Sequence, residues 1–226
     1  MKRKKLTASM IALVMSVSLP MTTYAANWYL EDGSVTVNAD NSGQTVTQGG
    51  GSAVPDEAPV ITQRESSVET GNTITISTSD NAAANVTIKD INIKSSKDAI
   101  DVTGSSSASI TLEGDNKIFS ETGSALHVSD GNVTINGSGS LKAEIQDEPF
   151  GYNHNAKIGS HEKEDMSGSI HITGDATVKT DDNIASNCGG DGAGIGSGEK
   201  GEMSGTIVID GNAQVEVSSN DRGAGI

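Results

Sequence analysis

Short segments in which aliphatic and polar residues alternate recur along most of the chain. They cover residues 72–77, 85–94, 108–116, 132–144, 166–180 and 203–217. In each segment Ile, Val or Leu alternates with residues such as Thr, Lys, Asn or Glu, which is the pattern of a β-strand with one buried and one solvated face. No segment of useful length has the spacing of an amphipathic helix. The pattern therefore predicts an all-β chain.

Glycine, often followed by Asp or Asn, separates the two strands of each unit. Such glycines stand at Gly114, Gly137, Gly174 and Gly211. Because glycine tolerates positive φ angles that a branched residue resists, we expect the chain to turn a corner at each of them. The repeating unit is thus a strand, a glycine corner and a second strand.

The last two segments are nearly the same sequence. MSGSIHITGDATVKT, residues 166–180, returns thirty-seven positions later as MSGTIVIDGNAQVEV, with eight identities. The identities include apolar positions expected to face inward, such as Ile170 with Ile207 and Ile172 with Ile209. We interpret the repetition as structural and expect Ile170 and Ile207 to lie one above the other.

The spacing of the units decides between architectures. The first strand of each unit starts with a pair of aliphatic residues, and the first members of these pairs are Val86, Ile110, Val133, Ile170 and Ile207. The steps between them are 24, 23, 37 and 37 residues. Repeats of about 20 to 50 residues indicate a solenoid, a propeller or an array, and a step of 23 or 24 is too short for a propeller blade. The steps therefore favour a right-handed parallel β-helix (a β-solenoid). The longer steps indicate loop insertions in the C-terminal turns, and such loops commonly form a binding face.

The N-terminus has the features of a secretory signal peptide. Basic residues at 2–5 precede a short apolar run, Pro20 and the small-x-small site Thr23-Tyr24-Ala25. We expect cleavage near Ala25–Ala26, export of the chain and no membrane insertion after cleavage.

Three segments follow from these patterns. We expect a signal peptide at 1–25, N-terminal strands with a cap and linker at 26–70, and the β-solenoid at 71–226. The last four residues, GAGI, reproduce Gly192–Ile195. We therefore interpret the solenoid as truncated mid-repeat, with a region beyond Ile226 that could attach it to the cell wall.

Composition supports an exported, acidic protein. Removal of the four basic residues at 2–5 changes the formal net charge from −15 to −19. Such a chain repels nucleic acid and anionic membrane surfaces. The chain holds only six aromatic residues, which indicates a narrow aliphatic core. Cys188 is the single cysteine and has no internal disulfide partner, and we expect a monomer.

Acidic residues near the second repeat are the candidate metal ligands. Asp181 and Asp182 are adjacent and Asp191 follows, so these three could bind calcium. Cleavage of a polysaccharide would require two positioned carboxylates of different pKa. A lyase would also require a basic side chain, and neither Arg64 nor Arg222 lies near the pair in sequence. We assign no catalytic residues.

The four histidines give no strong motif. His154 and His161 are seven residues apart in one loop, without a cysteine or a second acidic ligand arranged around them to make a zinc pattern. His127 is expected to point outward beside Leu126, and His171 is expected to be an ordinary surface residue.

The loop sequence EPFGYNHN combines aromatic rings with amide and imidazole groups. Phe150, Tyr152, Asn153 and His154 are therefore the candidate ligand-binding residues, because sugars offer both C–H faces and hydroxyl groups. The alternative is that the two aromatic rings simply fix the loop to the solenoid.

The motifs DINIKSSKDAIDV, GDGAGIGSG, SGTIVIDGNAQVEV and the terminal GAGI resemble those of secreted right-handed parallel β-helix proteins of clostridia-like Gram-positive bacteria. Among these is a family of carbohydrate-binding proteins that hold cellulose and acidic plant-wall sugars. The resemblance covers most of the mature chain but lies in scaffold residues, so it implies a fold and no particular ligand residue. Calcium in that family would imply an acid cluster here, with Asp181, Asp182 and Asp191 as the nearest candidates.

Three functions are compatible with these patterns. We expect a non-catalytic secreted or cell-surface module that binds polysaccharide, as an adhesin does. The alternatives are a pectate-lyase-like polysaccharide lyase or hydrolase, and a passive surface stalk.

Overall fold

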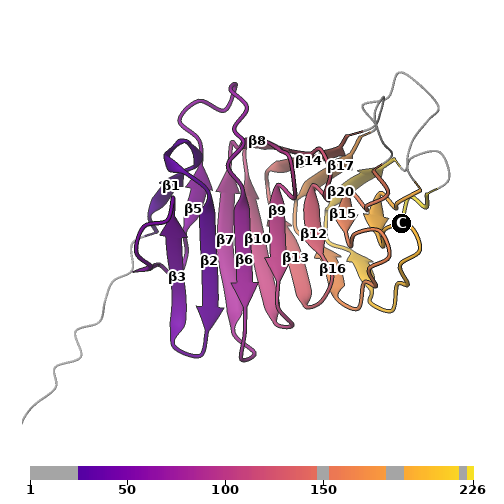
Figure 1. The fold of residues 1–226 in the computed structure, drawn as a ribbon, viewed down its shortest axis with the longest axis horizontal. Helices are drawn as coiled ribbons and strands as arrows, with labels where there is room; N and C mark the ends of the chain where they lie inside the picture. The colour runs from indigo at the N-terminus through magenta and orange to yellow at the C-terminus, as the bar shows by residue number, and fades with distance from the viewer. Residues whose placement is uncertain (1–24, 147–152, 182–190, 219–222) are drawn as a thin grey trace, which may run out of the picture.

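The computed structural model describes residues 25–146, 153–181, 191–218 and 223–226 (Figure 1). The predicted signal peptide lies almost entirely outside these residues. The described part contains twenty strands and one 3₁₀ helix, Leu30–Asp32, and none of its helical segments is long enough to span a membrane. The prediction of an all-β chain is confirmed.

The strands form three sheets, which we name A, B and C. Sheet A contains, in spatial order, β1 (Asn27–Tyr29), β5 (Val60–Thr62), β7 (Ala83–Lys89), β10 (Ser107–Glu113), β13 (Asn132–Gly137), β16 (Ser169–Ile172) and β19 (Ile207–Ile209). Sheet B contains β4 (Val54–Pro55), β3 (Gly43–Gln48), β2 (Val35–Asp40), β6 (Ile74–Thr78), β9 (Ile100–Thr103), β12 (Leu126–Val128), β15 (Ile158–Gly159) and β18 (Ile195–Gly196). Sheet C contains β8 (Asn92–Ser95), β11 (Asp115–Ser120), β14 (Ser140–Ile145), β17 (Thr177–Thr180) and β20 (Gln214–Val217).

From β6 onward the chain visits sheets B, A and C in turn and then starts the next coil. All strand pairs in this part are parallel, and the strands of successive coils lie side by side along the long axis (Figure 1). The antiparallel pairs are β2 with β3 and β3 with β4, at the N-terminal end of sheet B. This arrangement is compatible with the predicted β-solenoid.

The N-terminal strands belong to the same sheets as the later coils. β1 and β5 pair in parallel in sheet A, and β5 continues to β7. β2 pairs in parallel with β6 in sheet B. The predicted cap and linker region, 26–70, is therefore hydrogen-bonded directly to the first full coil.

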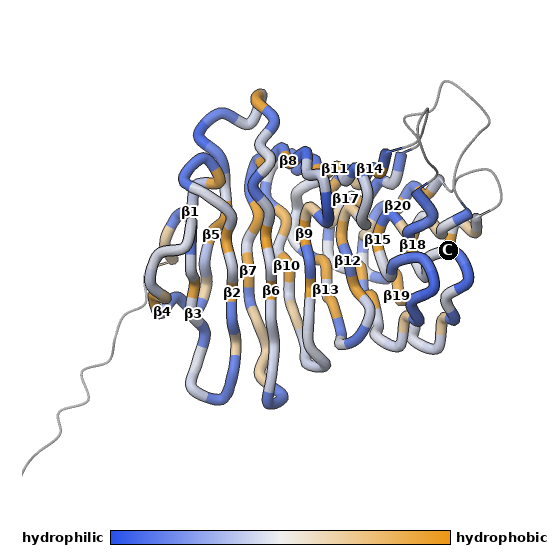
Figure 2. Tube along the Cα trace, in the orientation of Figure 1, coloured by the Kyte–Doolittle hydropathy of each residue, from blue (hydrophilic) through white to orange (hydrophobic). Residues whose placement is uncertain are grey.

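Aliphatic columns form the core between the sheets. In sheet A, Val86, Ile110, Ile135 and Ile172 stack in register and are at most 2% exposed, whereas Ile209 in the last described strand of the column is 40% exposed. Apolar residues lie along the strands, and polar residues dominate the connecting loops (Figure 2). Burial of each such side chain contributes about 1.5–3 kcal/mol to stability.

The register confirms one sequence prediction and corrects another. Ile170 pairs with Ile207, as the repeat predicts. Ile110 pairs with Ile135, and Val133 pairs with Ala108, so the predicted 23-residue step from Ile110 to Val133 is wrong by two residues. A shift of two keeps the same residues facing inward, so alternation alone does not fix this register.

The glycine corners are also confirmed. Gly114, Gly137, Gly174 and Gly211 have φ angles of 63°, 104°, 72° and 65°. These angles lie in the left-handed region that glycine enters without steric cost.

Two insertion loops, residues 160–165 and 197–202, join sheet B to sheet A and stack on each other. The backbone N–H of Lys163 donates to the carbonyl of Glu199 over 2.8 Å, and the N–H of Glu202 donates to Asp165 Oδ1 over 2.9 Å. Met166 and Met203 then form a parallel bridge. The predicted insertions are therefore ordered additions to the coil on one side of the stack.

Candidate functional site: a lysine column and a histidine–carboxylate cluster

The predicted ligand-binding loop is described only in part. Phe150 and Tyr152 lie outside the described residues. Asn153 is 6% exposed, and its amide Nδ2 donates to the carbonyl of Gly123 over 3.0 Å. His154 Nδ1 lies 2.5 Å from Glu199 Oε2. In the described part, Asn153 thus fastens the loop to the preceding coil, and the carbohydrate contact at this loop stays a prediction.

The predicted calcium ligands are likewise only partly described, because Asp182 lies outside the described residues. Asp181 Oδ2 lies 3.3 Å from Lys142 Nζ. The backbone N–H of Asp191 lies 3.4 Å from His154 Nδ1. The calcium site stays a prediction.

The outward face of sheet C carries the largest grouping of basic residues that the strands produce. Nine lysines lie beyond residue 25, and this face holds four of them: Lys94, Lys117, Lys142 and Lys179. Lys117, Lys142 and Lys179 occupy the same position of β11, β14 and β17, so they form one column. Neighbouring strands lie about 4.8 Å apart, which sets the step along this column.

Other side chains beside the column are an aromatic ring and hydrogen-bonding groups. Phe119 stands two residues beyond Lys117 and is half-buried, and the ammonium group of Lys94 lies 5.6 Å from its ring centroid. Asn92 precedes Lys117 in the column, and Gln146 lies beyond β14. The face therefore offers positive charge, an aromatic surface and amide groups together.

Two open hollows lie on this face. The first has a volume of about 460 Å³ and is lined by Ser66, Ser67, Asp90, Ile91, Asp115, Asn116, Lys117, Ser140 and Lys142. The second has a volume of about 320 Å³ and is lined by Glu69, Asn92, Ile93, Lys94, Lys117, Ile118, Phe119, Lys142, Glu144 and Gln146. Lys117 and Lys142 line both, so the hollows form adjoining parts of one surface.

Acidic side chains accompany most of the lysines of this face. Lys142 Nζ lies 2.9 Å from Glu144 Oε1, and Lys179 Nζ lies 3.3 Å from Glu216 Oε2. The hydrogen bond to Glu144 raises the pKa of Lys142. Within the described part of the chain, Lys117 is exposed and has no carboxylate within ion-pair distance. Lys142 is thus held protonated, and Lys117 has its ammonium group available to a ligand.

A second polar grouping covers the outward face of sheet B, where the first insertion loop folds back over two earlier coils. Asp101 on β9 and His127 on β12 pair in register, and Gly159 on β15 follows them in the same column. The loop after β15 carries His161 and Glu164. Gly159 has no side chain, so β15 places no side chain between His127 and the loop.

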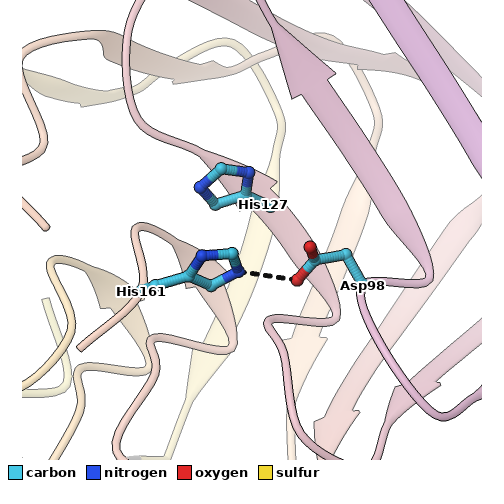
Figure 3. Close-up of side chains that lie close together, drawn as sticks. All are labelled: Asp98, His127 and His161. Carbon is cyan, nitrogen blue, oxygen red and sulfur yellow. Dashed lines mark hydrogen bonds and ion pairs between the residues drawn. The ribbon is translucent and has the colours of Figure 1, made fainter.

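The two histidines meet face to face (Figure 3). Their rings are stacked with centroids 4.0 Å apart and an interplanar angle of 5°. His161 Nε2 lies 2.8 Å from Asp98 Oδ1, which also accepts a 2.7 Å hydrogen bond from the backbone N–H of Ser124. His127 is therefore covered by His161, and its side chain is only 10% exposed.

Carboxylates lie at both nitrogens of His127. Nδ1 lies 2.8 Å from Asp101 Oδ1, and Nε2 lies 2.9 Å from Glu164 Oε2. Glu164 Oε2 also accepts from the backbone N–H of His161 over 3.0 Å. We call Asp98, Asp101, His127, His161 and Glu164 the histidine–carboxylate cluster.

The electrostatics of the cluster follow from these contacts. Burial alone would lower the pKa of His127, but its hydrogen bonds to Asp101 and Glu164 outweigh burial and raise the pKa to about 9. Burial alone would raise the pKa of Asp98, yet the hydrogen bond with His161 leaves it below its usual value. The pKa of Glu164 is also lowered, because the His161 backbone N–H and the His127 ring outweigh its burial.

This cluster was not predicted from the sequence. His127 was expected to point outward, and strand alternation does place it outside the coil between the inward Leu126 and Val128. The ring is nevertheless only 10% exposed, because the insertion loop covers it. The acidic partner of His161 was not recognised, because Asp98 lies 63 positions earlier in the chain.

Comparison with known proteins gives no further assignment: no family model, no curated protein and no solved structure matches this chain.

Proposed function

We propose that the chain is an exported right-handed parallel β-helix that binds an acidic polysaccharide, without cleaving it, along the outward face of sheet C. The observation that carries this proposal is the column of Lys117, Lys142 and Lys179 in an otherwise acidic protein. The fold part rests on the parallel coils, since connections between parallel strands of one sheet are right-handed in about 98% of cases. Export rests on the N-terminal signal pattern.

The lysine column fits a linear polyanion. A polyuronate carries one carboxylate on each sugar, so a strand laid along the stacking axis meets ammonium groups at regular intervals. The ring of Phe119 beside the column offers a surface for the C–H face of a sugar. Asn92, whose Nδ2 donates to the carbonyl of Ser66 over 3.2 Å, lines the second hollow and offers its amide oxygen to a sugar hydroxyl. A flat and open surface of this kind suits a polymer better than a small enclosed ligand.

The charges on this face favour binding over cleavage. A lysine that acts as a general base needs a lowered pKa. The pKa of Lys142 is instead raised by its hydrogen bond to Glu144. Lys142 is therefore a protonated lysine held by Glu144 and Asp181 and not a base, while Lys117 beside it has its ammonium group available to a carboxylate.

The proposal predicts weaker polyuronate binding when the column loses its charge. In the triple variant Lys117→Gln, Lys142→Gln, Lys179→Gln, the affinity for oligogalacturonate should fall about tenfold at low salt, because each exposed ion pair contributes up to about 1 kcal/mol. Isothermal titration calorimetry at two salt concentrations measures the loss, and the wild-type affinity should decrease with salt.

The matched control is Lys89→Gln. Lys89 is an exposed lysine on sheet A, where it pairs with Glu113 over 3.2 Å. Its substitution should leave the affinity unchanged. Equal affinity of the triple variant and the wild type would contradict the lysine column as the binding surface. Equal binding of a neutral cello-oligosaccharide would contradict an acidic ligand, and release of product sugars would favour the lyase or hydrolase.

A further inference from the structure

Apart from sheet C, the structure brings together a donor set that suits a transition metal. One potential ligand atom from each of Asp98, His127 and His161 lies within 4.8 Å of the other two (Figure 3). Among the described residues, these three are the group of His, Cys, Asp or Glu side chains that lie close enough together to bind one metal ion. The donors come from three successive coils: the turn before β9, strand β12 and the loop after β15.

We propose that Asp98, His127 and His161 form a binding site for a divalent transition-metal ion of the zinc class, which fastens the first insertion loop to the two preceding coils. Two imidazole nitrogens and a carboxylate oxygen are ligands typical of zinc and its neighbours, whereas calcium takes oxygen ligands. Glu164, whose Oε2 lies 2.9 Å from His127 Nε2, is placed to supply a fourth ligand.

The surroundings of His127 support this assignment. Asp101 Oδ1 lies 2.8 Å from Nδ1, so it orients the ring and leaves Nε2 for the metal. A carboxylate in this position behind a ligating histidine is the usual outer partner of a metal site. Asp101 is thus a positioning residue rather than a ligand.

Metal binding requires one ring of the stack to turn, because an imidazole nitrogen binds a metal in the plane of its ring and these two rings are nearly parallel. Two imidazolium ions with centroids 4.0 Å apart would repel each other. The repulsion is avoided when at least one of the two rings is neutral. A neutral imidazole nitrogen is a metal ligand. Next to the stack, Ser124 donates its backbone N–H to Asp98, while its buried hydroxyl has no hydrogen-bond partner among the described residues.

Metal binding requires a small contraction of the cluster. With metal–ligand bonds of about 2 Å in tetrahedral geometry, two donors of one ion lie about 3.3 Å apart. The donor atoms, which now lie within 4.8 Å of one another, must therefore approach by up to about 1.5 Å. Asp98 and His161 are both partly exposed, and His161 is carried by a loop, so these two side chains have room for the movement.

The test is titration of the protein, purified without a histidine tag and freed of metal with EDTA, with ZnCl₂ and CaCl₂. Calorimetry should show one zinc ion per chain. His161→Gln and Asp98→Asn should each weaken zinc binding at least about tenfold. The control His171→Gln should bind zinc as the wild type does, because His171 lies on sheet A and pairs with Asp210. Calcium binding at any other site should not change in His161→Gln.

A second measurement on the wild-type chain removes dependence on how the variants fold. The chain has four histidines, and zinc should shift the imidazole NMR signals of His127 and His161 while those of His154 and His171 stay in place. Absence of zinc binding, shifts at His154 or His171 instead, or undiminished binding by both variants would overturn the proposal.

Discussion

Replacement of Gly159 by alanine is expected to lower the melting temperature by about 6–12 °C, which corresponds to about 3 kcal/mol for a chain of this length. Gly159 has φ 139°, and a Cβ atom built on it would lie 1.7 Å from the carbonyl oxygen of Gly196. The overlap is with backbone of the next coil, so no side-chain rotation relieves it. The left-handed conformation adds about 1–2 kcal/mol.

In the alanine variant this overlap would push β15 away from β18 in the next coil. Gly159 pairs with His127 on one side and with Gly196 on the other. A shift of β15 away from β18 therefore also moves the loop that carries His161 and Glu164. We expect thermal unfolding, followed by circular dichroism, to show the loss of stability.

Gly50→Ala is the matched control. Gly50 has φ 77°, but a Cβ atom there would meet nothing within 4 Å. This variant carries the conformational cost of about 1–2 kcal/mol alone and should lose about 2–8 °C, less than Gly159→Ala. If Gly159→Ala were no less stable than Gly50→Ala, the close approach of β15 and β18 would be wrong.

The general arrangement of this fold could be predicted from the sequence because its signals are local. Alternation identifies the inward side of each strand, as for Ile170, and a glycine identifies each corner, as for Gly174. The alternation of apolar and polar residues repeats every two residues. The pairing of Ile110 with Ile135 instead of Val133 was missed for that reason, since both registers bury the same side.

Part of the histidine–carboxylate cluster could have been found in the same way. The segments DAIDV, beginning at Asp98, and SALHV, beginning at Ser124, are consecutive turns of sheet B, and their alignment places Asp101 above His127. The repeat steps of 24, 23, 37 and 37 residues come from the strands of sheet A alone, and they do not include these two segments of sheet B.

The remaining contacts could not be predicted from periodicity. His161 and Glu164 lie in an insertion loop, whose path depends on hydrogen bonds such as that from Ser160 Oγ to the carbonyl of Glu164. A loop of this kind has no repeat that fixes its direction. The contact between His161 and Asp98 joins residues 63 positions apart and depends on that path.

The metal-free protein is expected to lose stability as the pH rises from 7 to 9.5. The pKa of His127 is raised to about 9 from 6.5 by its two carboxylate partners. Protonated His127 therefore favours the folded state, and the stabilisation is complete below pH 6.5 and lost as the pH rises through 9. The shift corresponds to at most about 3–4 kcal/mol, and solvent screening of Asp101 and Glu164, whose side chains are 31% and 36% exposed, reduces it to about 1–3 kcal/mol.

Three neighbouring groups decide how this loss is interpreted. Asp101 and Glu164 face the two nitrogens of His127, and His161 stacks on its ring. The pKa of Glu164 is lowered, so its interaction with His127 changes in this pH range only through the proton on the imidazole. Melting curves in EDTA at pH 7, 8, 9 and 9.5 measure the effect.

His127→Gln removes the titrating group while it keeps a polar side chain between the two carboxylates. This variant should be less stable than the wild type at pH 7, and the difference should shrink towards pH 9.5, because the wild-type imidazole has lost its proton there. His171→Gln should retain the wild-type pH dependence, since His171 pairs with Asp210 on another sheet. A difference between wild type and His127→Gln that stays constant from pH 7 to pH 9.5 would show that His127 stabilises the coils by packing alone, and that its proton contributes nothing.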